Sequence, residues 1–125
     1  MYNQKVFDEF HSPKNVGVIA DANGVGTVGS AACGDIMKMY LKIINGVIID
    51  AKFQTFGCAA AIASSSVATQ MLIGKTVDDA LKITNAQVIE QLEGLPPQKI
   101  HCSVLAEEAI RAAIGNYFEK REERC

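Results

Sequence analysis

Four cysteines are the residues of this sequence best suited to chemistry, and three of them stand in distinct local settings. Cys33 lies in Ala-Cys-Gly-Asp, Cys58 in Phe-Gly-Cys-Ala and Cys102 in Ile-His-Cys-Ser. In a reducing cytoplasm, where we expect this protein, cysteines serve as metal ligands or reactive thiols more often than as disulfides. No two cysteines form a C-x-x-C pair, so neither a thioredoxin motif nor a paired zinc knuckle fits. Cys125 lies in a charged terminal stretch and is predicted not to be a ligand.

The settings of Cys58 and Cys102 favour the thiolate, which is the form that binds metal or attacks sulfur. Each is predicted to begin a helix, where unpaired N–H groups and the positive end of the helix dipole favour negative charge. Lys99 and a protonated His101 act in the same direction on Cys102. A single buried cysteine is usually an inert small hydrophobe, but the joint pattern favours a site. His101 itself fits a metal ligand, a hydrogen-bonding neighbour of a ligand or a polar residue at a helix start.

A β-hairpin is predicted to position the first two cysteines. Residues 37–43 alternate between apolar and polar types, and residues 47–53 do so again after Asn45-Gly46. A two-residue turn would set Met39 against Lys52 and mix the two faces. We therefore predict a three-residue loop, with Gly46 in the left-handed conformation, that pairs Ile43 with Val47.

This register places Cys33 across from Gly57, next to Cys58. Asp35 would share the face of Cys33, because side chains repeat every two residues along a strand. We therefore expect Cys33, Asp35 and Cys58 to meet at the open end of the hairpin, with Asp35 as a candidate oxygen ligand.

Helices are predicted before and after these strands in the sequence. Apolar spacing predicts a short helix before Pro13, and a strand is expected over Val25 to Ala32. Small residues from Ala59 to Gly74 indicate a closely packed helix, and two short helices follow, capped by Thr76 and Thr84. A long C-terminal helix is expected to start near Ser103, and Ser103 is its predicted N-cap. Its last residues, 119–125, are expected to fray. The order of elements predicts an α+β fold.

Length, composition and charge bound the function. A chain of 125 residues with 49% hydrophobic side chains suits one domain over 1–125. The net charge is −2, and the basic residues are scattered, so nucleic acid is not an expected partner. No apolar run approaches the roughly 20 residues that span a bilayer, and no secretion signal opens the sequence, so no membrane partner is expected.

The sequence resembles the IscU family, which includes the N-terminal domain of NifU. The likeness runs from Asn15-Val16-Gly17 nearly to the C-terminus. Three separate motifs carry it in the same order: Ala32-Cys33-Gly34-Asp35, the stretch 55–63 (Thr-Phe-Gly-Cys-Ala-Ala-Ala-Ile-Ala) and the stretch 95–103 (Leu-Pro-Pro-Gln-Lys-Ile-His-Cys-Ser).

The resemblance implies a three-stranded antiparallel sheet with about four to five helices packed on one side. It implies a scaffold, not an enzyme with turnover, that assembles a [2Fe-2S] cluster and transfers it to recipient apo-proteins. The implied ligands are Cys33, Cys58 and Cys102 with Asp35 or His101. The implied partners are a cysteine desulfurase of the IscS/NifS kind and donors of iron (Fe²⁺) and electrons. Some members form a [4Fe-4S] cluster on a homodimer, and some are isolated with Zn²⁺.

Two features depart from the family pattern. Bacterial members carry Leu-Pro-Pro-Val-Lys, which a dedicated Hsp70-type chaperone recognises, whereas this sequence has Gln98 at the fourth position, which puts that recognition in doubt. Cys125 also lies outside the three-cysteine pattern. The chemistry leaves two other classes open: a closed zinc site completed by Asp35 or His101, and a thiol-based sulfur transferase, for which Cys102 would be the sulfur acceptor.

Overall fold

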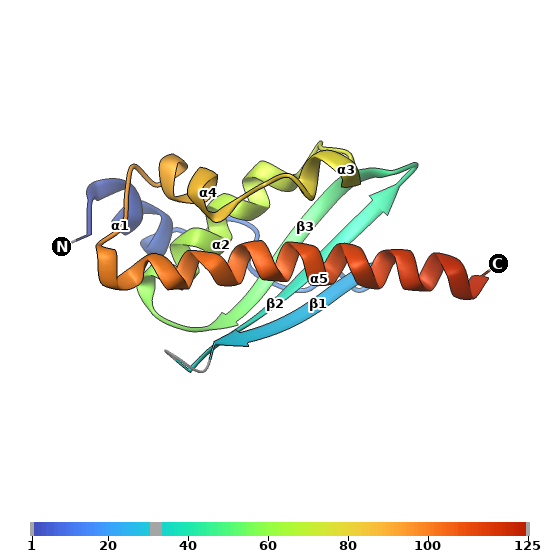
Figure 1. Ribbon diagram of the computed structural model, residues 1–125, viewed down its shortest axis with the longest axis horizontal. Coiled ribbons are helices and arrows are strands. Elements are labelled where there is room, and N and C mark those ends of the chain that lie inside the picture. Colours follow the sequence, from blue (N-terminus) through green and yellow to red (C-terminus); the bar gives the residue numbers. More distant parts are fainter. Residues whose placement is uncertain (1, 31–33, 125) are drawn as a thin grey trace.

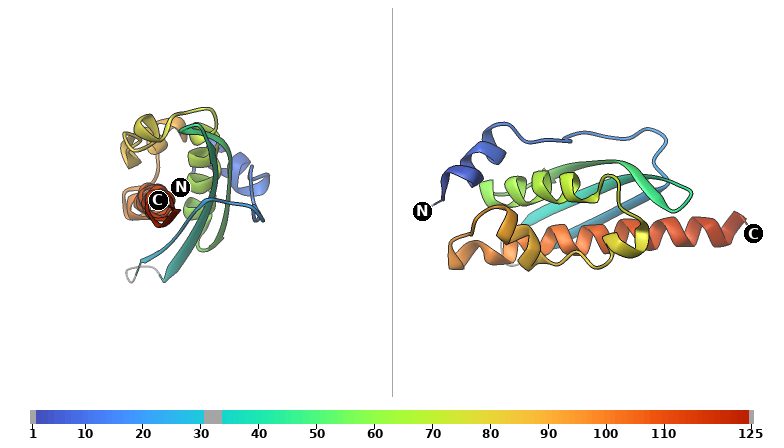
Figure 2. Two further views of the ribbon diagram at one scale, coloured as in Figure 1. Left: turned by 90° about the vertical axis from the view of Figure 1, so that its right-hand side faces the viewer. Right: turned by 90° about the horizontal axis from the view of Figure 1, so that it is seen from above.

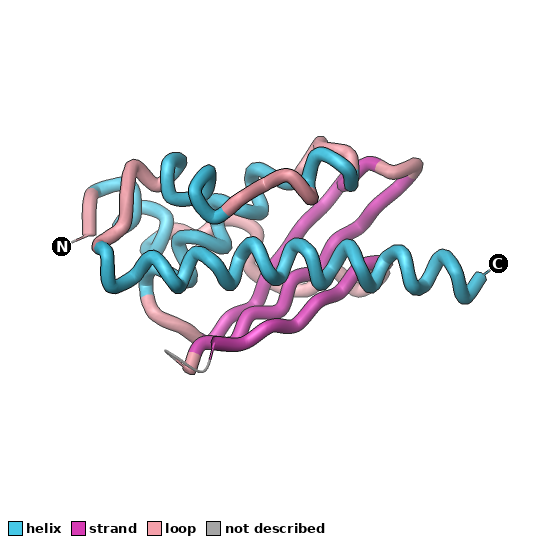
Figure 3. Tube along the Cα trace, viewed as in Figure 1, coloured by secondary structure: helices cyan, strands magenta, loops and turns pink. Residues whose placement is uncertain are grey.

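The order of elements is one helix, three strands and a run of helices (Figures 1 and 3). The computed structural model describes residues 2–30 and 34–124, apart from the side chains of residues 30, 98, 101, 102 and 121–124. The elements are α1 (Gln4–His11), β1 (Gly24–Ser30), β2 (Asp35–Ile44), β3 (Val47–Phe56), α2 (Ala59–Leu72), α3 (Val77–Ala80), α4 (Asn85–Gln91), the 3₁₀ helix η1 (Pro97–Lys99) and α5 (Ile100–Arg124). The predicted α+β fold is confirmed.

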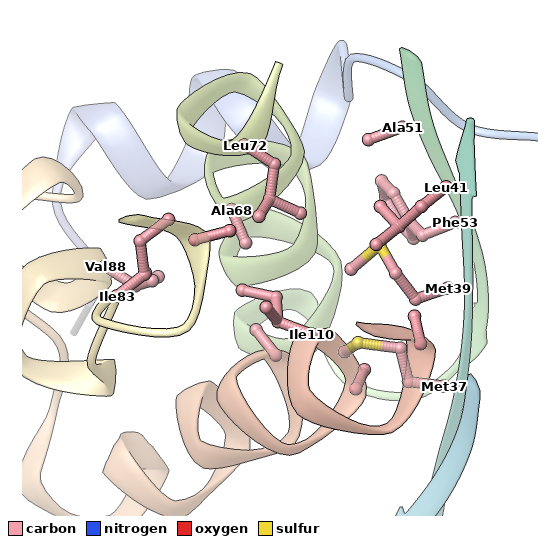
Figure 4. Close-up of a cluster of buried hydrophobic side chains, with 14 of the residues drawn as sticks. Met37, Met39, Leu41, Ala51, Phe53, Ala68, Leu72, Ile83, Val88 and Ile110 are labelled. Carbon is pink, nitrogen blue, oxygen red and sulfur yellow. The ribbon is translucent and has the colours of Figure 1, made fainter. Parts of the chain in front are cut away.

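The sheet has the strand order β1-β2-β3 and is antiparallel throughout. Helix α5 lies along β1 and β2, and α2 lies along β3, so the two helices cover one face of the sheet (Figures 2 and 4). The inward side chains of β2 are buried there, and Met37, Met39 and Leu41 are all 0% exposed. The opposite face of the sheet carries polar residues together with exposed apolar ones. This one-sided cover confirms the expected arrangement of helices.

The β2–β3 hairpin differs from the predicted register. Ile44 pairs with Val47, so the turn has two residues, and Asn45 and Gly46 both have positive φ, 53° and 76°. A type I′ turn of this kind matches the right-handed twist of the strands. One extra residue then enters β3, because Ile43 pairs with Ile48 while Lys42 pairs with Asp50.

This bulge keeps the buried face apolar and explains why the predicted three-residue loop was wrong. Beyond it Leu41 pairs with Ala51, and Met39 pairs with Phe53 and not with Lys52. Ile49 is the residue that leaves the ladder, and it is 50% exposed where the alternation predicted it buried. Ile48 takes the inward position and is fully buried.

The helices before and after the sheet follow the predicted pattern at most positions. The N-terminal helix and the helix after Ala59 are present as α1 and α2. Thr76 caps α3 by accepting from the Asp79 N–H at 3.2 Å, and Thr84 forms a full capping box with Gln87 at the start of α4. The first strand ends at Ser30 in the structure, and the last two residues of the predicted strand lie outside the described residues.

Helix α5 begins earlier than the sequence pattern predicted. Ser103 lies inside the helix and donates its hydroxyl to the Ile100 carbonyl at 2.7 Å, so it is not the N-cap. The 3₁₀ turn η1, which opens at Pro97, already winds the chain and continues directly into α5 at Ile100. The helix runs to Arg124. Fraying of 119–125 concerns mobility, and it stays a prediction.

Two glycines let β1 approach α5 at backbone distance. A Cβ at Gly24 would lie 2.7 Å from the Ala113 carbonyl oxygen, and one at Gly26 would lie 2.5 Å from the Ala113 nitrogen. The Val25 N–H also donates to the Asn116 side chain at 3.0 Å. Strand and helix therefore share a backbone-level contact. Within the described part of the chain, none of the helices combines the length and apolar character needed to cross a membrane.

Candidate metal centre

One end of the molecule gathers the sequence motifs that carry the cysteines. The pairings Ser30–Asp35 and Ile36–Phe56 bring the end of β1, the start of β2 and the end of β3 to the same edge of the sheet. Helix α2 starts three residues after β3 ends, and α5 starts at this same end of the molecule (Figures 1 and 2). The hairpin turn lies at the opposite end.

Asp35 is the first residue of β2, and its carboxyl group is buried at this edge. The residue is 5% exposed and continues the inward row that Met37 and Met39 begin. Its Oδ2 lies 3.8 Å from the Cys58 sulfur, in a contact where the thiol donates. A buried carboxylate is costly without polar partners, so its position beside a thiol favours a functional role over a solvated strand edge.

Gly57 leaves space for the Asp35 carboxyl group beside Cys58. A Cβ at position 57 would lie 3.0 Å from Asp35 Cγ, 3.1 Å from Asp35 Oδ2 and 2.9 Å from Ala61 Cβ. A side chain there would force Ala61 or the Asp35 carboxyl group to shift. The glycine in Phe-Gly-Cys-Ala therefore makes room for the aspartate.

Cys58 occupies the N-cap position of α2, as the sequence predicted. Its backbone is extended, with φ −76° and ψ 173°, and its carbonyl accepts from the Ile62 N–H at 3.1 Å. The half-buried residue packs with Tyr2 and Leu95 against the fully buried Ala60 and Ala61. We call these five residues the satellite cluster.

The third motif leads into α5. Lys99 is half-buried and ends η1, and its N–H donates to the Pro96 carbonyl at 2.8 Å. His101 and Cys102 follow as the second and third residues of α5, which places both in its first turn. Their side chains are not among those described.

The described side chains bring together two of the predicted ligands, Asp35 and Cys58. No group of three His, Cys, Asp or Glu side chains that could hold a metal ion occurs among them. Cys33 and Cys125 lie outside the described residues. The full set of Cys33, Asp35, Cys58 and Cys102, with His101 as alternate ligand, therefore stays a prediction.

The predicted contact across the hairpin is corrected by the observed register. Because Ile36 pairs with Phe56, the residue that continues the ladder toward Gly57 is Asp35, where the predicted register had Cys33. The convergence of Asp35 with Cys58 is present, but it arises through the bulge and not through the predicted loop. The bulge moves the ladder by one residue relative to the turn.

Two polar residues of the N-terminal segment make hydrogen bonds to distant parts of the chain and were not singled out from the sequence. Asn3 caps α1 and also donates its amide group to carbonyls after α4. Glu9 is 6% exposed and accepts from Ser66 Oγ at 2.6 Å and Gln70 Nε2 at 2.9 Å, both on α2. The position of Asn3 before an amphipathic segment was a capping signal, whereas nothing local marks Glu9 as buried.

Glu9 is held in its charged form. Burial acts to raise its pKa, but the hydrogen bonds from Ser66 and Gln70, together with the charges of Lys5 and Lys14, outweigh burial. The net result is a pKa below the ordinary value of 4.5. The Lys5 ammonium lies 3.5 Å from Glu9 Oε2.

The sequence matches one protein family over nearly its whole length. Residues 1–124 match the family described as NifU-like N terminal domain, and the chain belongs to this family.

Named relatives cover nearly the whole chain. The "Iron-sulfur cluster assembly scaffold protein IscU 1" of Archaeoglobus fulgidus is 61% identical over 120 residues, which span 96% of this chain and 78% of that protein. The "Iron-sulfur cluster assembly scaffold protein IscU" of Escherichia coli strain K12 is 52% identical over 125 residues, 97% of each chain.

Solved structures share the fold. A putative iron–sulfur cluster assembly scaffold protein for the SUF system from Fervidobacterium islandicum AW-1 has a TM-score of 0.77 at 25% identity, covering 90% of this chain and 96% of that one. A NifU-like protein (N-terminal) from Brucella abortus has a TM-score of 0.76 at 25% identity, covering 94% of each chain.

Proposed function

We propose that this protein is a scaffold on which a [2Fe-2S] cluster is assembled and from which the cluster passes to recipient apo-proteins. The supporting observation is a buried carboxylate, Asp35, beside the thiol of Cys58, in a chain that belongs to the NifU-like N terminal domain family. The cluster is cargo in this proposal. It arrives as iron and sulfur and leaves intact, so retention and release must be balanced.

Cys33, Cys58 and Cys102 hold the cluster as thiolates, and Asp35 supplies the fourth ligand, with His101 as the alternate. Thiolates are the usual ligands of iron–sulfur clusters, whereas a carboxylate oxygen is harder and holds the iron less firmly. A site with three cysteines and one aspartate therefore releases its cluster more readily than a four-cysteine site. Such release is what a donor requires.

Sulfur enters at Cys102 from the persulfide of a cysteine desulfurase. The Cys102 thiolate attacks the terminal sulfur, the donor's sulfur–sulfur bond breaks, and the desulfurase leaves as a thiolate while a persulfide forms on Cys102. The first turn of α5 and the neighbouring Lys99 favour the attacking thiolate. Iron and electrons come from separate donors, and the whole exchange takes place in the cytoplasm without turnover by the scaffold itself.

Anaerobic reconstitution with ferrous iron and sulfide tests the proposal. Visible absorption and iron and sulfide analysis should report a sulfide-containing cluster on the wild-type protein. Cys33→Ala, Cys58→Ala and Cys102→Ala should each lose stable cluster, and Cys125→Ala should keep it as the matched control. Stoichiometric zinc binding without any sulfide chromophore would contradict the scaffold function, and full cluster content in Cys58→Ala would contradict the ligand set.

A further inference from the structure

Asn3 joins the start of α1 to the chain that leads into α5. Its Oδ1 accepts from the Val6 N–H at 2.9 Å and caps α1. Its Nδ2 donates to three successive carbonyls after α4, those of Leu92 at 2.9 Å, Glu93 at 3.0 Å and Gly94 at 3.2 Å. Leu95 follows immediately, so the Asn3 side chain holds the point from which the segment toward η1 begins.

The carbonyls that Asn3 binds lie in a turn with unusual backbone angles. Glu93 and Gly94 both have positive φ, 62° and 109°. Such a conformation is unfavourable for a glutamate and persists only where the surroundings hold it. The Asn3 amide group is one of those surroundings, from about ninety residues away in the chain.

Glu9 joins the other end of α1 to α2. Its carboxylate accepts from Ser66 Oγ and Gln70 Nε2, and the same Ser66 hydroxyl accepts from the Lys14 N–H at 2.8 Å. Charge-assisted hydrogen bonds in a buried setting are among the stronger polar contacts of a protein. Helix α1 is therefore fixed to α2 at one end and to the turn after α4 at the other.

The satellite cluster brings residues next to these attachments together at the start of α2. Tyr2 precedes Asn3, Leu95 follows the turn that Asn3 binds, and Cys58 begins the helix that Glu9 binds. All three pack on Ala60 and Ala61. The N-terminal segment thus contacts both chain segments that lead to cysteines of the candidate centre.

We propose that Asn3 and Glu9 are positioning residues for the candidate centre: Glu9 fixes α1 to the second half of α2, the helix that begins at Cys58, and Asn3 fixes α1 to the segment that enters α5, which carries Cys102. We call Asn3, Glu9 and their hydrogen bonds the α1 clasp. The inference rests on the proposed function for its purpose, while the clasp itself is a property of the protein without cluster.

The simpler alternative is that α1 only covers part of the core through Val6, which is fully buried. A cover would lower the stability of the whole molecule when weakened and would affect no region in particular. Weakening a clasp would instead affect one region, because the hydrogen bonds of Asn3 end at the turn after α4. Hydrogen exchange of individual backbone amides therefore distinguishes a clasp from a cover.

The first experiment compares Asn3→Ser with Asn23→Ser in the protein without cluster, by hydrogen exchange. Serine keeps the oxygen that caps α1 and removes the donors to Leu92, Glu93 and Gly94. Asn23 is the matched control, because it also bonds backbone groups through both side-chain atoms, those of Ile43 at 2.7 Å and 2.8 Å, at the far end of the sheet.

In Asn3→Ser, the amides of Gly94 and Lys99, which donate to Ile89 and Pro96, should exchange about tenfold faster. The amide of Phe7, inside α1, should stay within about twofold, because the cap is kept. Asn23→Ser should leave Gly94 and Lys99 unchanged. Equal acceleration of Gly94 and Lys99 in the two variants would overturn the clasp.

The second experiment tests whether the two ends of α1 act together. Glu9→Gln weakens the contact with α2 and removes the ion pair with Lys5, and neither of these touches the turn after α4. A clasp still predicts faster exchange at Gly94 and Lys99, because Asn3 loses its position when α1 shifts. Gln4→Ala, which removes an exposed hydrogen bond to Asp8 within α1, is the control and should have no effect there. No change at Gly94 and Lys99 in Glu9→Gln would overturn the coupling.

Cluster lifetime then links the clasp to the site. After reconstitution with ferrous iron and sulfide, Asn3→Ser should lose its visible absorbance about tenfold faster than wild type, and Asn23→Ser should match wild type. Faster exchange with an unchanged cluster lifetime would overturn the positioning role. If the wild-type protein assembled no cluster at all, the proposed function would fail, and the exchange results would still decide whether the clasp exists.

Discussion

Asp35 combines burial, charge and a thiol neighbour in one residue. It ends the inward row of β2, is 5% exposed, and lies 3.8 Å from the Cys58 sulfur. In the proposed site it is the fourth ligand of the cluster, and a carboxylate oxygen holds iron less firmly than a thiolate. The proposal therefore predicts that Asp35 makes the cluster easier to release.

Asp35→Ala should therefore lengthen cluster lifetime several-fold and slow transfer, because it removes the labile ligand and the charge. Decay of visible absorbance in air and transfer to an apo-ferredoxin measure the two effects. Unchanged decay and transfer would mean that Asp35 only terminates the strand. Complete loss of cluster would make it an obligatory ligand, contrary to the proposal.

Gly57→Ala should displace the Asp35 carboxyl group and destabilise the fold by about 1–3 kcal/mol, because the new Cβ would lie within 3.1 Å of Asp35 and Ala61 atoms. Gly29→Ala is the matched control, since its Cβ would meet the Asp35 backbone oxygen at an ordinary 3.5 Å. Urea unfolding compares the two variants. Equal stability of both would show that the space at position 57 is not limiting.

At the scale of single residues, the sequence predicted which residue types carry the chemistry better than it predicted which residues touch. Cysteines with a nearby aspartate stand out by their chemistry, so Asp35 and Cys58 were found and the structure brings them together. The roles of Gly57, Asn3 and Glu9 depend on groups that come close only in the folded chain. Glu9 lies on a helix with exposed neighbours, and only the approach of Ser66 and Gln70 makes its burial favourable.

The β2–β3 hairpin shows how two local rules combine at the scale of elements. Asn45-Gly46 favours a two-residue turn, and the apolar alternation favours a different register. The predicted register follows the apolar alternation alone, whereas the chain satisfies both rules by leaving Ile49 out of the ladder. A bulge was the missing alternative, because it changes register without changing the turn.

Deletion of Ile49 should consequently be tolerated, with a stability change within about 1 kcal/mol, because the pairs Ile43–Ile48 and Lys42–Asp50 would become consecutive. Deletion of Lys52 provides the contrast. It would turn residues beyond it to the wrong face, including Phe53, which is 1% exposed, and should cost several times more. Thermal unfolding measures both, and similar losses would contradict the bulge assignment.

The contribution of helix α1 to the stability of the fold should depend on pH through Glu9. Its pKa is lowered in the folded protein, so the charged form stabilises the fold above the ordinary value of 4.5, and this contribution is lost as pH falls through the lowered value. The stability difference between wild type and Glu9→Gln should therefore be larger at neutral pH and shrink in acid. Urea unfolding over this range measures it, and a difference independent of pH would contradict the charge effect.

At the scale of the whole molecule, the order of elements was enough to predict an α+β fold, and the motif order indicated the family. Amphipathic periods and caps such as Thr84 with Gln87 are local, so they can be read without knowing the partner surfaces. The start of α5 was placed too late, because a 3₁₀ turn after two prolines already winds the chain. The close approach of β1 to α5 had no signal beyond the glycines themselves.

Gly26→Ala should separate β1 from α5 and cost several kcal/mol, since its Cβ would lie within 2.7 Å of three atoms of Ala112 and Ala113. Gly115→Ala in α5 is the control. Nothing lies within 4 Å of its Cβ, so removing a helix glycine should stabilise the protein by about 0.5–1 kcal/mol. Thermal unfolding compares the two, and a mild effect at Gly26 would contradict the tight contact.

The contact between β1 and α5 also has a consequence for biosynthesis. The strand is synthesised about ninety residues before the helix that covers it, so its inner face has no α5 to pack against during that part of synthesis. Contacts so distant in sequence form late and leave apolar surface open in the meantime. The close contact of β1 at Gly24 and Gly26 can therefore form only after α5 has been synthesised.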